Sequence, residues 1–232
     1  MDAVILAAGI GSRLNKYTLN TPKCLVKVND KPILLRQLEI LQSSNIDTIY
    51  VVGGCHFKVL KDFIDSLEYK NIVLIENKDY LTTNNMYSLS MVSTYLKNKD
   101  FLWLNGDVVF EKEAIEGLLS LKLQNGIAVD KRVYLEESMK ITFDGHKITA
   151  ISKQIKEEDA YATSIDIYKI NKATSIVLFN YIEEFLKTDK KSWSEVALNN
   201  IFSQCDFTYY AINCHWVEID NEQDLMQASQ LF

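Results

Sequence analysis

The chain has 232 residues, 47% of them hydrophobic, and a formal net charge of −6 at pH 7, which is enough for one domain, residues 1–232, with a large core. The acidic balance and the lack of Lys/Arg runs argue against nucleic acid as a partner. No apolar run approaches the roughly 20 residues that cross a bilayer, and strand residues begin already at Ala3, where a signal peptide would stand. We therefore expect a cytoplasmic protein that does not engage membranes.

Strands alternate with helices through the first half, which predicts a parallel sheet with crossover helices. The expected strands are residues 3–6, 49–52, 72–75 and 101–104, and the expected helices open at Pro32, at Phe57 and before Leu89. The pattern changes to alternating, hairpin-like strands over 126–170, and helices are expected at 175–186, 194–202 and 222–229. The fold class is therefore α/β, a Rossmann-like mixed sheet, mostly parallel, flanked by helices, with a small β-hairpin region.

The most informative stretch is residues 6–14, Leu-Ala-Ala-Gly-Ile-Gly-Ser-Arg-Leu, which follows the first apolar strand. Its small side chains let backbone N–H groups touch a ligand, and such groups suit phosphate. Arg13 ends this loop, and Lys23 adds a second cation within a Thr-Pro-Lys run. Leu14 replaces the third glycine of a dinucleotide fingerprint, and no Gly-Lys-Ser/Thr follows at P-loop spacing. The loop predicts a polyphosphate site of another kind.

This stretch, with the later Pro-Lys pair, resembles the signature of the nucleotidyltransferases, the sugar-phosphate and choline-phosphate nucleotidylyltransferases. An N-terminal strand and turn that merely uses glycine would explain Gly9 and Gly11 but neither Arg13 nor Lys23. The resemblance implies that Arg13 and Lys23 are catalytic cations on a nucleoside triphosphate. The nucleotide-binding residues that it implies in the loop and after the second strand are Leu6, Ala8, Gly9, Gly11 and Gly53.

Asn105-Gly106-Asp107 directly follows the expected strand 101–104. Ligands of open α/β sheets bind beyond the carboxyl ends of strands, so Asp107 should face the same crevice as the phosphate loop. Asn-Gly-Asp is also turn-prone, and a carboxylate here could simply cap the next helix. The resemblance implies that Asp107 is a ligand of Mg²⁺.

A second metal candidate lies near the other end, in Trp216-Val217-Glu218-Ile219-Asp220. Glu218 and Asp220 are two apart on an expected strand and so face the same side. Asp220 could instead cap the helix expected at 222–229. The segment resembles the closing stretch of the same family, which implies that Asp220 is the second Mg²⁺ ligand and Glu218 an accessory group.

Residues 82–89, Thr-Thr-Asn-Asn-Met-Tyr-Ser-Leu, follow the third strand and open a helix. Asn84, Asn85 and Ser88 could serve only that helix start, where Asn and Ser are favoured. The Asn-Asn-x-Tyr-Ser run resembles choline-phosphate and related cytidylyltransferases, whereas sugar-nucleotide enzymes more often carry a Gly-Thr-Ala-like stretch. The resemblance implies that the three residues bind nucleotide, and it favours CTP over UTP or dTTP.

The middle of the chain resembles a bacterial branch of the family that acts on small phosphoryl or phosphonyl acceptors, among them phosphocholine, 2-aminoethylphosphonate and phosphoglutamine. Lys140 and Lys153 lie on adjacent expected strands and could clamp the acceptor phosphate, although either could be a solvated strand lysine. Asp130 and Asp166 could receive an ammonium group. Some relatives have a glycine in place of Asp166, which leaves the acceptor's identity open.

A quaternary ammonium on the acceptor would need aromatic walls. Tyr134, Tyr161 and Trp193 are available, but their spacing singles out none of them.

The resemblance implies a Mg²⁺-dependent cytidylyltransferase that moves CMP from CTP to a small phosphorylated or phosphonylated acceptor and releases pyrophosphate, for decoration of a cell-surface glycan. A nucleotide-binding half, about 1–125, would precede an acceptor-binding half, about 126–220. The enzymatic alternative is a sugar-1-phosphate nucleotidyltransferase that makes an NDP-sugar, and the non-enzymatic alternative is a nucleotide-sensing module. A homodimer is compatible with the sequence.

Overall fold

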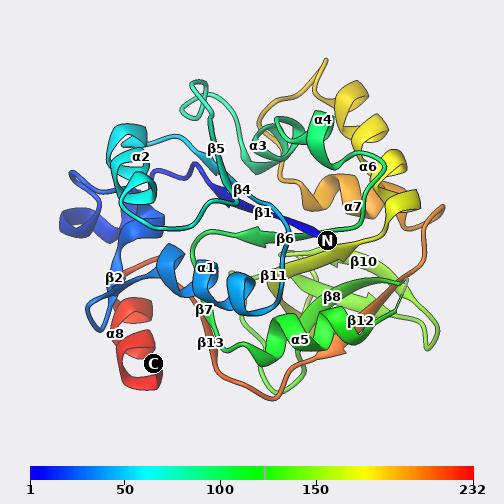
Figure 1. Cartoon of the computed structure of the whole chain (residues 1–232). Helices are drawn as coiled ribbons and strands as arrows, with labels where there is room; N and C mark the ends of the chain where they lie inside the picture. Colours follow the sequence, from blue (N-terminus) through cyan, green and yellow to red (C-terminus); the bar gives the residue numbers. More distant parts are fainter. Residues whose placement is uncertain (123) are drawn as a thin grey trace.

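The fold is known from a computed structural model, which describes residues 1–122 and 124–232. A nine-stranded mixed sheet runs through the centre of the molecule (Figure 1). Its strands are β1 (Asp2–Ala7), β4 (Ile49–Gly53), β5 (Ile72–Glu76), β6 (Phe101–Asn105), β8 (Asn125–Asp130), β9 (Lys140–Phe143), β10 (Ile148–Ser152), β11 (Ala162–Ile170) and β12 (Phe207–Ala211). The order β10-β9-β11-β6-β1-β4-β5 forms the main path, and β8 pairs with β11 and β12. This arrangement confirms the predicted fold class.

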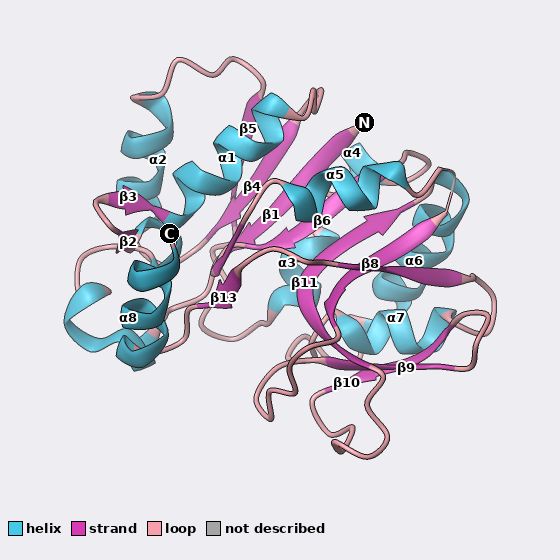
Figure 2. Ribbon diagram, turned by 90° about the horizontal axis from the view of Figure 1, so that it is seen from below, coloured by secondary structure: helices cyan, strands magenta, loops and turns pink. Residues whose placement is uncertain are grey.

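Helices cover both faces of the sheet, because side chains of successive strand residues point to opposite sides. One face packs against α1 (Ile33–Ser43), α2 (Phe57–Asp65) and α5 (Glu113–Ser120). The other packs against α3 (Asn85–Ser90), α4 (Ser93–Leu96), α6 (Lys172–Phe185) and α7 (Glu195–Ile201) (Figure 2). In β1, Ala3 and Ile5 join the first of these cores, whereas Val4 and Leu6 join the second.

The parallel strands β6, β1, β4 and β5 agree with the expected strands of the first half to within one residue at each end. The helix expected around Leu89 is instead divided into α3 and α4. Ser90 Oγ donates to the carbonyl of Tyr87, and the N–H of Met91 bonds only three residues back, to Ser88, so the helix tightens and ends there. Leu89 still packs in the same core.

The second half is less regular than a series of hairpins. Strands β9 and β10 form a hairpin around Asp144 and Gly145, within the region where hairpin-like strands are predicted. Strand β11 instead runs antiparallel to β6, β8 and β9 together. Its register against β8 shifts between Ser164 and Tyr168, where Asp166 has a left-handed φ of 57°. The sequence analysis also missed β12, which pairs with β8 in parallel.

Besides two 3-10 helices, the described residues form four more short strands and a last helix, namely β2 (Lys27–Val28), β3 (Lys31–Pro32), β7 (Val108–Phe110), β13 (Trp216–Glu218) and α8 (Glu222–Leu231). The strand β7 pairs with β13, and α8 packs in a small separate core with Leu14, Val26 and Val28. The last segment of the chain therefore returns to the loop after β1.

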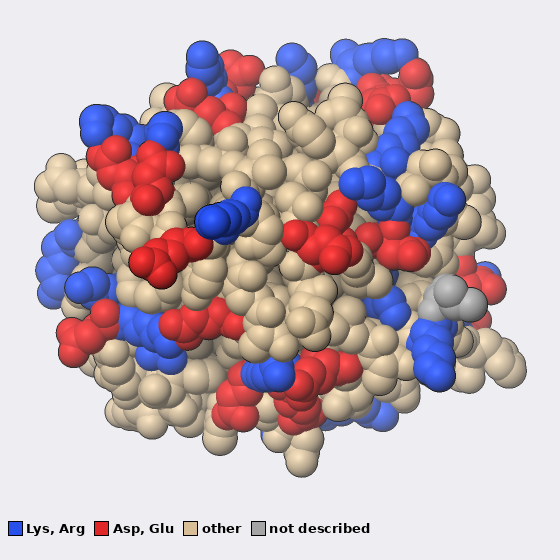
Figure 3. Space-filling model, in the orientation of Figure 1, with Lys and Arg blue, Asp and Glu red and all other residues tan. Residues whose placement is uncertain are grey.

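Acidic and basic side chains are interspersed on the face shown in Figure 3, where no continuous basic patch forms. Within the described residues, no helix has both the length and the apolar character that a bilayer crossing would need.

Candidate active site

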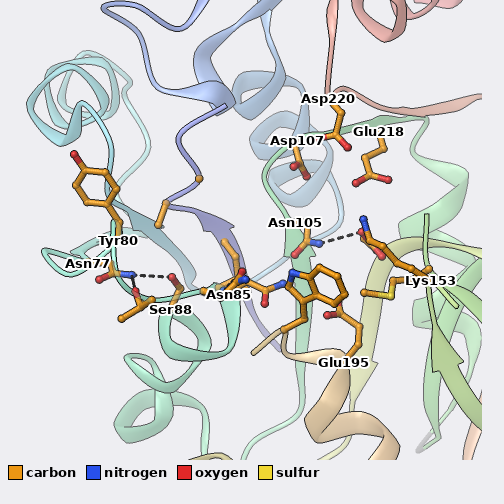
Figure 4. Close-up of a pocket in the computed structure, with 18 of the residues that line it drawn as sticks. Asn77, Tyr80, Asn85, Ser88, Asn105, Asp107, Lys153, Glu195, Glu218 and Asp220 are labelled. Carbon is orange, nitrogen blue, oxygen red and sulfur yellow. Dashed lines mark hydrogen bonds between the residues drawn. The ribbon is translucent and has the colours of Figure 1, made fainter. Parts of the chain in front are cut away.

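A cavity of about 240 Å³ lies at the carboxyl ends of β1 and β6, the edge of an open α/β sheet where ligands bind (Figure 4). The first half of the chain contributes, among others, Leu6, Ala8, Gly9, Arg13, Asn84, Asn85 and Ser88. The first half also contributes Asn105 and Asp107, and the second half contributes, among others, Lys153, Asp166, Trp193, Glu195, Glu218 and Asp220. Most of the residues that the sequence analysis singled out therefore meet around one space.

The pairing of β7 with β13 brings Asp107 beside Asp220. Glu218 is opposite Val108 in this pair, and the N–H of Ile219 donates to the carbonyl of Asp107 at 2.9 Å. Asp107, Glu218 and Asp220 each offer a carboxylate oxygen, and these three oxygens lie within 4.8 Å of one another. Residues more than 100 positions apart thus form one acidic cluster.

Two cations neutralise part of this cluster. Lys23 Nζ lies 2.6 Å from Asp107 Oδ2 and 2.7 Å from Asp220 Oδ1, and Arg13 Nη2 lies 2.8 Å from Asp220 Oδ2. Burial disfavours the charged form of Lys23, but the two carboxylates outweigh it and hold the lysine pKa above its usual value. Burial likewise opposes the ionised form of Asp220, but Lys23 and Arg13 hold the pKa of that carboxyl below its usual value.

The donor set of the cluster fits a hard divalent cation. Carboxylate oxygens are the ligands that Mg²⁺ prefers in proteins. Asp107 Oδ1 is buried and has no hydrogen-bond partner among the described residues, so it is an acceptor that a cation could satisfy. Burial first, and then the neighbouring carboxylates of Asp166, Asp107 and Asp220, raise the pKa of Glu218 to about 8, so a cation bound here would favour its ionised form.

The loop after β1 faces the cavity through only part of its predicted nucleotide-binding set. Leu6, Ala8 and Gly9 line the cavity, whereas Gly11 and Gly53 do not. Gly11 has φ 68°, a left-handed conformation suited to glycine, and is the N-cap of the short 3-10 helix Ser12–Tyr17. A Cβ on Gly53 would lie 2.4 Å from Leu60 Cδ2, so packing of α2 explains this glycine. Their contacts with nucleotide stay predictions.

Asn84 and Asn85 are both engaged in holding chain segments. Asn84 is the N-cap of α3, its side chain accepting from the N–H of Asn85, and its own Nδ2 donates to the carbonyl of Lys191. Asn85 Oδ1 accepts from the N–H of Ser194. These bonds tie the start of α3 to the segment before α7. Asn84 therefore caps the helix, which is one of the two roles that the sequence allowed. Asn84 and Asn85 both line the cavity as well, and their contacts with nucleotide stay predictions.

The four residues predicted to bind the acceptor divide into two pairs. Lys153 and Asp166 line the cavity. Asp130 lies outside its lining, and Arg132 and Trp216 Nε1 donate to its carboxylate. Lys140 is fully buried and also outside the lining, with Nζ 2.7 Å from the carbonyl oxygen of Glu136 and 2.5 Å from that of Lys153.

These contacts give Asp130 and Lys140 local partners of their own. Lys140 is not a solvated strand lysine, and through the carbonyl of Lys153 it supports a residue that does reach the cavity. A direct contact of Asp130 or Lys140 with an acceptor is not what this geometry favours.

Asp166 belongs to a buried hydrogen-bonded network. Tyr168 Oη lies 3.0 Å from Asp166 Oδ1 and 3.0 Å from Glu195 Oε1, and Asn105 Nδ2 donates to Asp166 Oδ2 at 3.1 Å. Burial raises the pKa of Asp166 to about 7, with help from the nearby carboxylates of Glu195 and Asp107. Burial also raises the pKa of Glu195.

Replacement of Asp166 with Asn should make the metal-free protein more stable at pH 8 than the wild type. The unfolded pKa of Asp is about 3.9, so the stability contributed by Asp166 is present below that pH and lost as the pH rises towards 7. Asn cannot ionise and also tolerates a left-handed φ. The gain should be on the order of a few kcal/mol at pH 8 and should vanish near pH 4. Urea unfolding in EDTA at both pH values measures it, and a variant less stable than wild type at pH 8 would contradict this account.

Two residues of the cavity, Glu195 and Asn105, were not predicted as site residues, whereas Trp193 was among the aromatic candidates and does line the cavity. Asn105 stands at a strand end beside Gly106-Asp107, so its position carried a usable signal. Glu195 lies in the first turn of an apolar helix, where glutamate is common for other reasons. Its burial depends on the packing of α7 beside β10 and α6, which the sequence does not encode locally.

A Rossmann-like mixed sheet with a small-residue loop after its first strand, and acidic residues gathered at the strand ends, define the nucleotidyltransferase class. The chain belongs to the family of MobA-like NTP transferase domains, whose sequence profile matches residues 3–136.

The chain is similar to two cytidylyltransferases, among other relatives. It is 25% identical over 250 residues to the CTP:phosphoglutamine cytidylyltransferase of Campylobacter jejuni, with 97% of this chain and 98% of the relative covered. It is 43% identical over 99 residues to the choline-phosphate cytidylyltransferase of Streptococcus pneumoniae, covering 42% of each chain.

Among solved structures, the inositol-1-phosphate CTP transferase from T. maritima superposes with a TM-score of 0.83 at 20% identity, over 99% of this chain and 96% of the other. At this identity the likeness confirms the fold.

Proposed function

We propose that the protein is a Mg²⁺-dependent cytidylyltransferase that transfers CMP from CTP to a small phosphorylated or phosphonylated acceptor and releases pyrophosphate. The observation that carries the proposal is the convergence of Arg13 and Lys23 with Asp107 and Asp220 at the end of β1. Two cations and two carboxylates from four separate segments are the groups that a triphosphate and its metal need. The cytidylyltransferase relatives support CTP as the nucleotide.

In this reaction an acceptor oxygen attacks the α-phosphorus of CTP, and the bond from that phosphorus to the oxygen bridging to the β-phosphate breaks. A phosphate or phosphonate oxygen is already ionised at neutral pH, so the acceptor needs no general base. Arg13 and Lys23 would neutralise charge on the triphosphate, and the loop from Leu6 to Gly11 would approach it through its backbone.

Asp107 and Asp220, with Glu218 beside them, would hold the metal. When bound, Mg²⁺ would supply positive charge to the phosphates. We place nucleotide binding mainly in residues 1–125 and acceptor binding mainly in 126–220. Asn84, Asn85 and Ser88 would lie against the nucleotide, and Lys153 and Asp166 against the acceptor. The protein would act in the cytoplasm, and its product would feed the decoration of a cell-surface glycan.

Pyrophosphate release with each of the four common ribonucleoside triphosphates and dTTP tests this proposal. The acceptors should include 2-aminoethylphosphonate, phosphocholine, phosphoglutamine and hexose 1-phosphates. Release is expected with CTP and a small non-sugar acceptor, and EDTA should abolish it. Release with UTP or dTTP and a hexose 1-phosphate would show a sugar-nucleotide enzyme instead. No release with any pair would overturn the proposal.

A further inference from the structure

The acceptor side of the cavity brings three acidic side chains together in a largely buried place. Asp166 and Glu195 are 7% and 3% exposed, and Glu218 lies beside them on the cavity wall. None of the three forms an ion pair with a described residue; the cation that shares this wall, Lys153, has its Nζ 5.5 Å from the centre of the Trp193 ring. Buried carboxylates are costly unless paired, so this wall is built for a ligand with positive charge.

The hydrogen bonds of Asp166 and Glu195 also favour a ligand that donates hydrogen bonds. Tyr168 Oη is 3.0 Å from a carboxylate oxygen of Asp166 and 3.0 Å from one of Glu195. One hydroxyl carries one hydrogen, so it can donate to only one of them. Two further donors reach the pair only at long distances, Ser164 Oγ to Asp166 Oδ1 at 3.5 Å and Ser194 Oγ to Glu195 Oε2 at 3.4 Å, so both carboxylates keep acceptor capacity for a ligand N–H.

Asn105 adds an acceptor that also lacks a donor. Its Nδ2 donates to Asp166, which fixes the direction of the amide. Its Oδ1 is buried and has no hydrogen-bond partner among the described residues. Since Asn105 lines the cavity beside Lys153 and Glu195 (Figure 4), the missing donor can come from a ligand.

We propose that the acceptor substrate carries a primary ammonium group, bound between the carboxylates of Asp166 and Glu195 and the side-chain oxygen of Asn105. This inference rests on the proposed function and narrows its acceptor class. A primary ammonium group has three N–H donors, one for each of these three acceptors, and its positive charge would pair with the two carboxylates. The phosphoryl or phosphonyl end of the acceptor then points towards the cluster of Asp107 and Asp220.

A quaternary ammonium group fits this wall poorly. It has no N–H to offer Asn105 Oδ1, and it needs several aromatic faces around it. The aromatic side chains among the described cavity-lining residues are Tyr80 and Trp193, and Lys153 already stands over Trp193. Of the other aromatic candidates, Tyr134 lies under Lys140 and Tyr161 under Lys131, and neither lines the cavity.

The test compares acceptors that differ only at nitrogen. Pyrophosphate release from CTP is measured with 2-aminoethylphosphonate, its N-methyl and N,N,N-trimethyl forms, and propylphosphonate, which is uncharged at that end. The primary ammonium compound should have a kcat/KM at least about tenfold above the trimethyl form and about a hundredfold above propylphosphonate. Equal use of the trimethyl form or of propylphosphonate would overturn the inference and leave the proposed function intact. No release with any acceptor would overturn both.

A variant pair connects this selectivity to the wall. Asp166→Asn keeps the backbone conformation and removes the charge, so the preference for the primary ammonium compound over the trimethyl form should fall to about threefold or less, mainly through KM. Asp206→Asn makes the same change at an exposed carboxylate paired with Lys147 and should keep the wild-type preference. An unchanged preference in Asp166→Asn would overturn the placement of the ammonium group.

Discussion

Asp107→Asn is expected to lower kcat for pyrophosphate release by about a hundred- to a thousandfold, the size of effect seen when one preorganised charge-stabilising group is lost. Asp107 Oδ2 is paired with Lys23, but Oδ1 is buried and has no hydrogen-bond partner among the described residues, so this oxygen is available to a metal ion. Asn has nearly the same shape but no charge. We therefore expect the loss in activity without a loss of fold.

Measurements of stability and of metal binding distinguish the loss of a metal ligand from damage to the fold. The change relieves repulsion with Glu218 and Asp220 but also removes the ion pair with Lys23, which keeps Asp220 as its partner, so the thermal midpoint in EDTA should fall only slightly. The stabilisation that millimolar Mg²⁺ gives the wild type should shrink. Asp62→Asn, at an exposed position on α2, serves as the matched control and should retain full activity. Wild-type turnover in Asp107→Asn would remove Asp107 from the active site.

Lys23→Met is expected to have the second large effect, on both activity and stability. Lys23 bridges Asp107 and Asp220 at hydrogen-bonding distance, and its side chain is only 12% exposed. Its loss leaves two partly buried carboxylates with Arg13 as the remaining close cation. Removal of one partner of a buried ion pair costs about 3 kcal/mol or more, so the metal-free variant should unfold at markedly lower urea concentration.

The change in stability that Mg²⁺ causes distinguishes the loss of the lysine charge from simple damage to the core. Mg²⁺ should stabilise Lys23→Met more than it stabilises the wild type, because the carboxylates no longer have their lysine. Turnover should nonetheless stay at least about a hundredfold below wild type, since the triphosphate lacks its cation. Lys27→Met, four residues on at an exposed position of β2, is the control and should change neither quantity. Full activity in Lys23→Met would contradict a catalytic role.

The regular part of the fold was predictable because its signals are local. Unbroken apolar runs identified β1, β4, β5 and β6, and the small-residue loop after β1 identified the phosphate site. Asp107 could be placed as well, since a strand end in an open α/β sheet fixes where its next residues lie.

The acceptor region was harder because its geometry depends on long-range pairing. Strand β11 contacts three neighbours at once and has a left-handed residue in its middle, which no alternation of polar and apolar residues reveals. Lys140 and Lys153 are similar in sequence context, yet one is buried against carbonyl oxygens and the other lines the cavity. Only the packed structure distinguishes them.

The lysine between the two aspartates has a consequence for the order in which ligands arrive. Lys23 occupies the gap between Asp107 and Asp220, and Glu218 lies beside them. A triphosphate entering without a cation would meet three carboxylates and gain little from a lysine engaged elsewhere. Nucleotide and metal should therefore load as one neutralised unit, and the lysine should transfer from carboxylate to phosphate only as that unit enters.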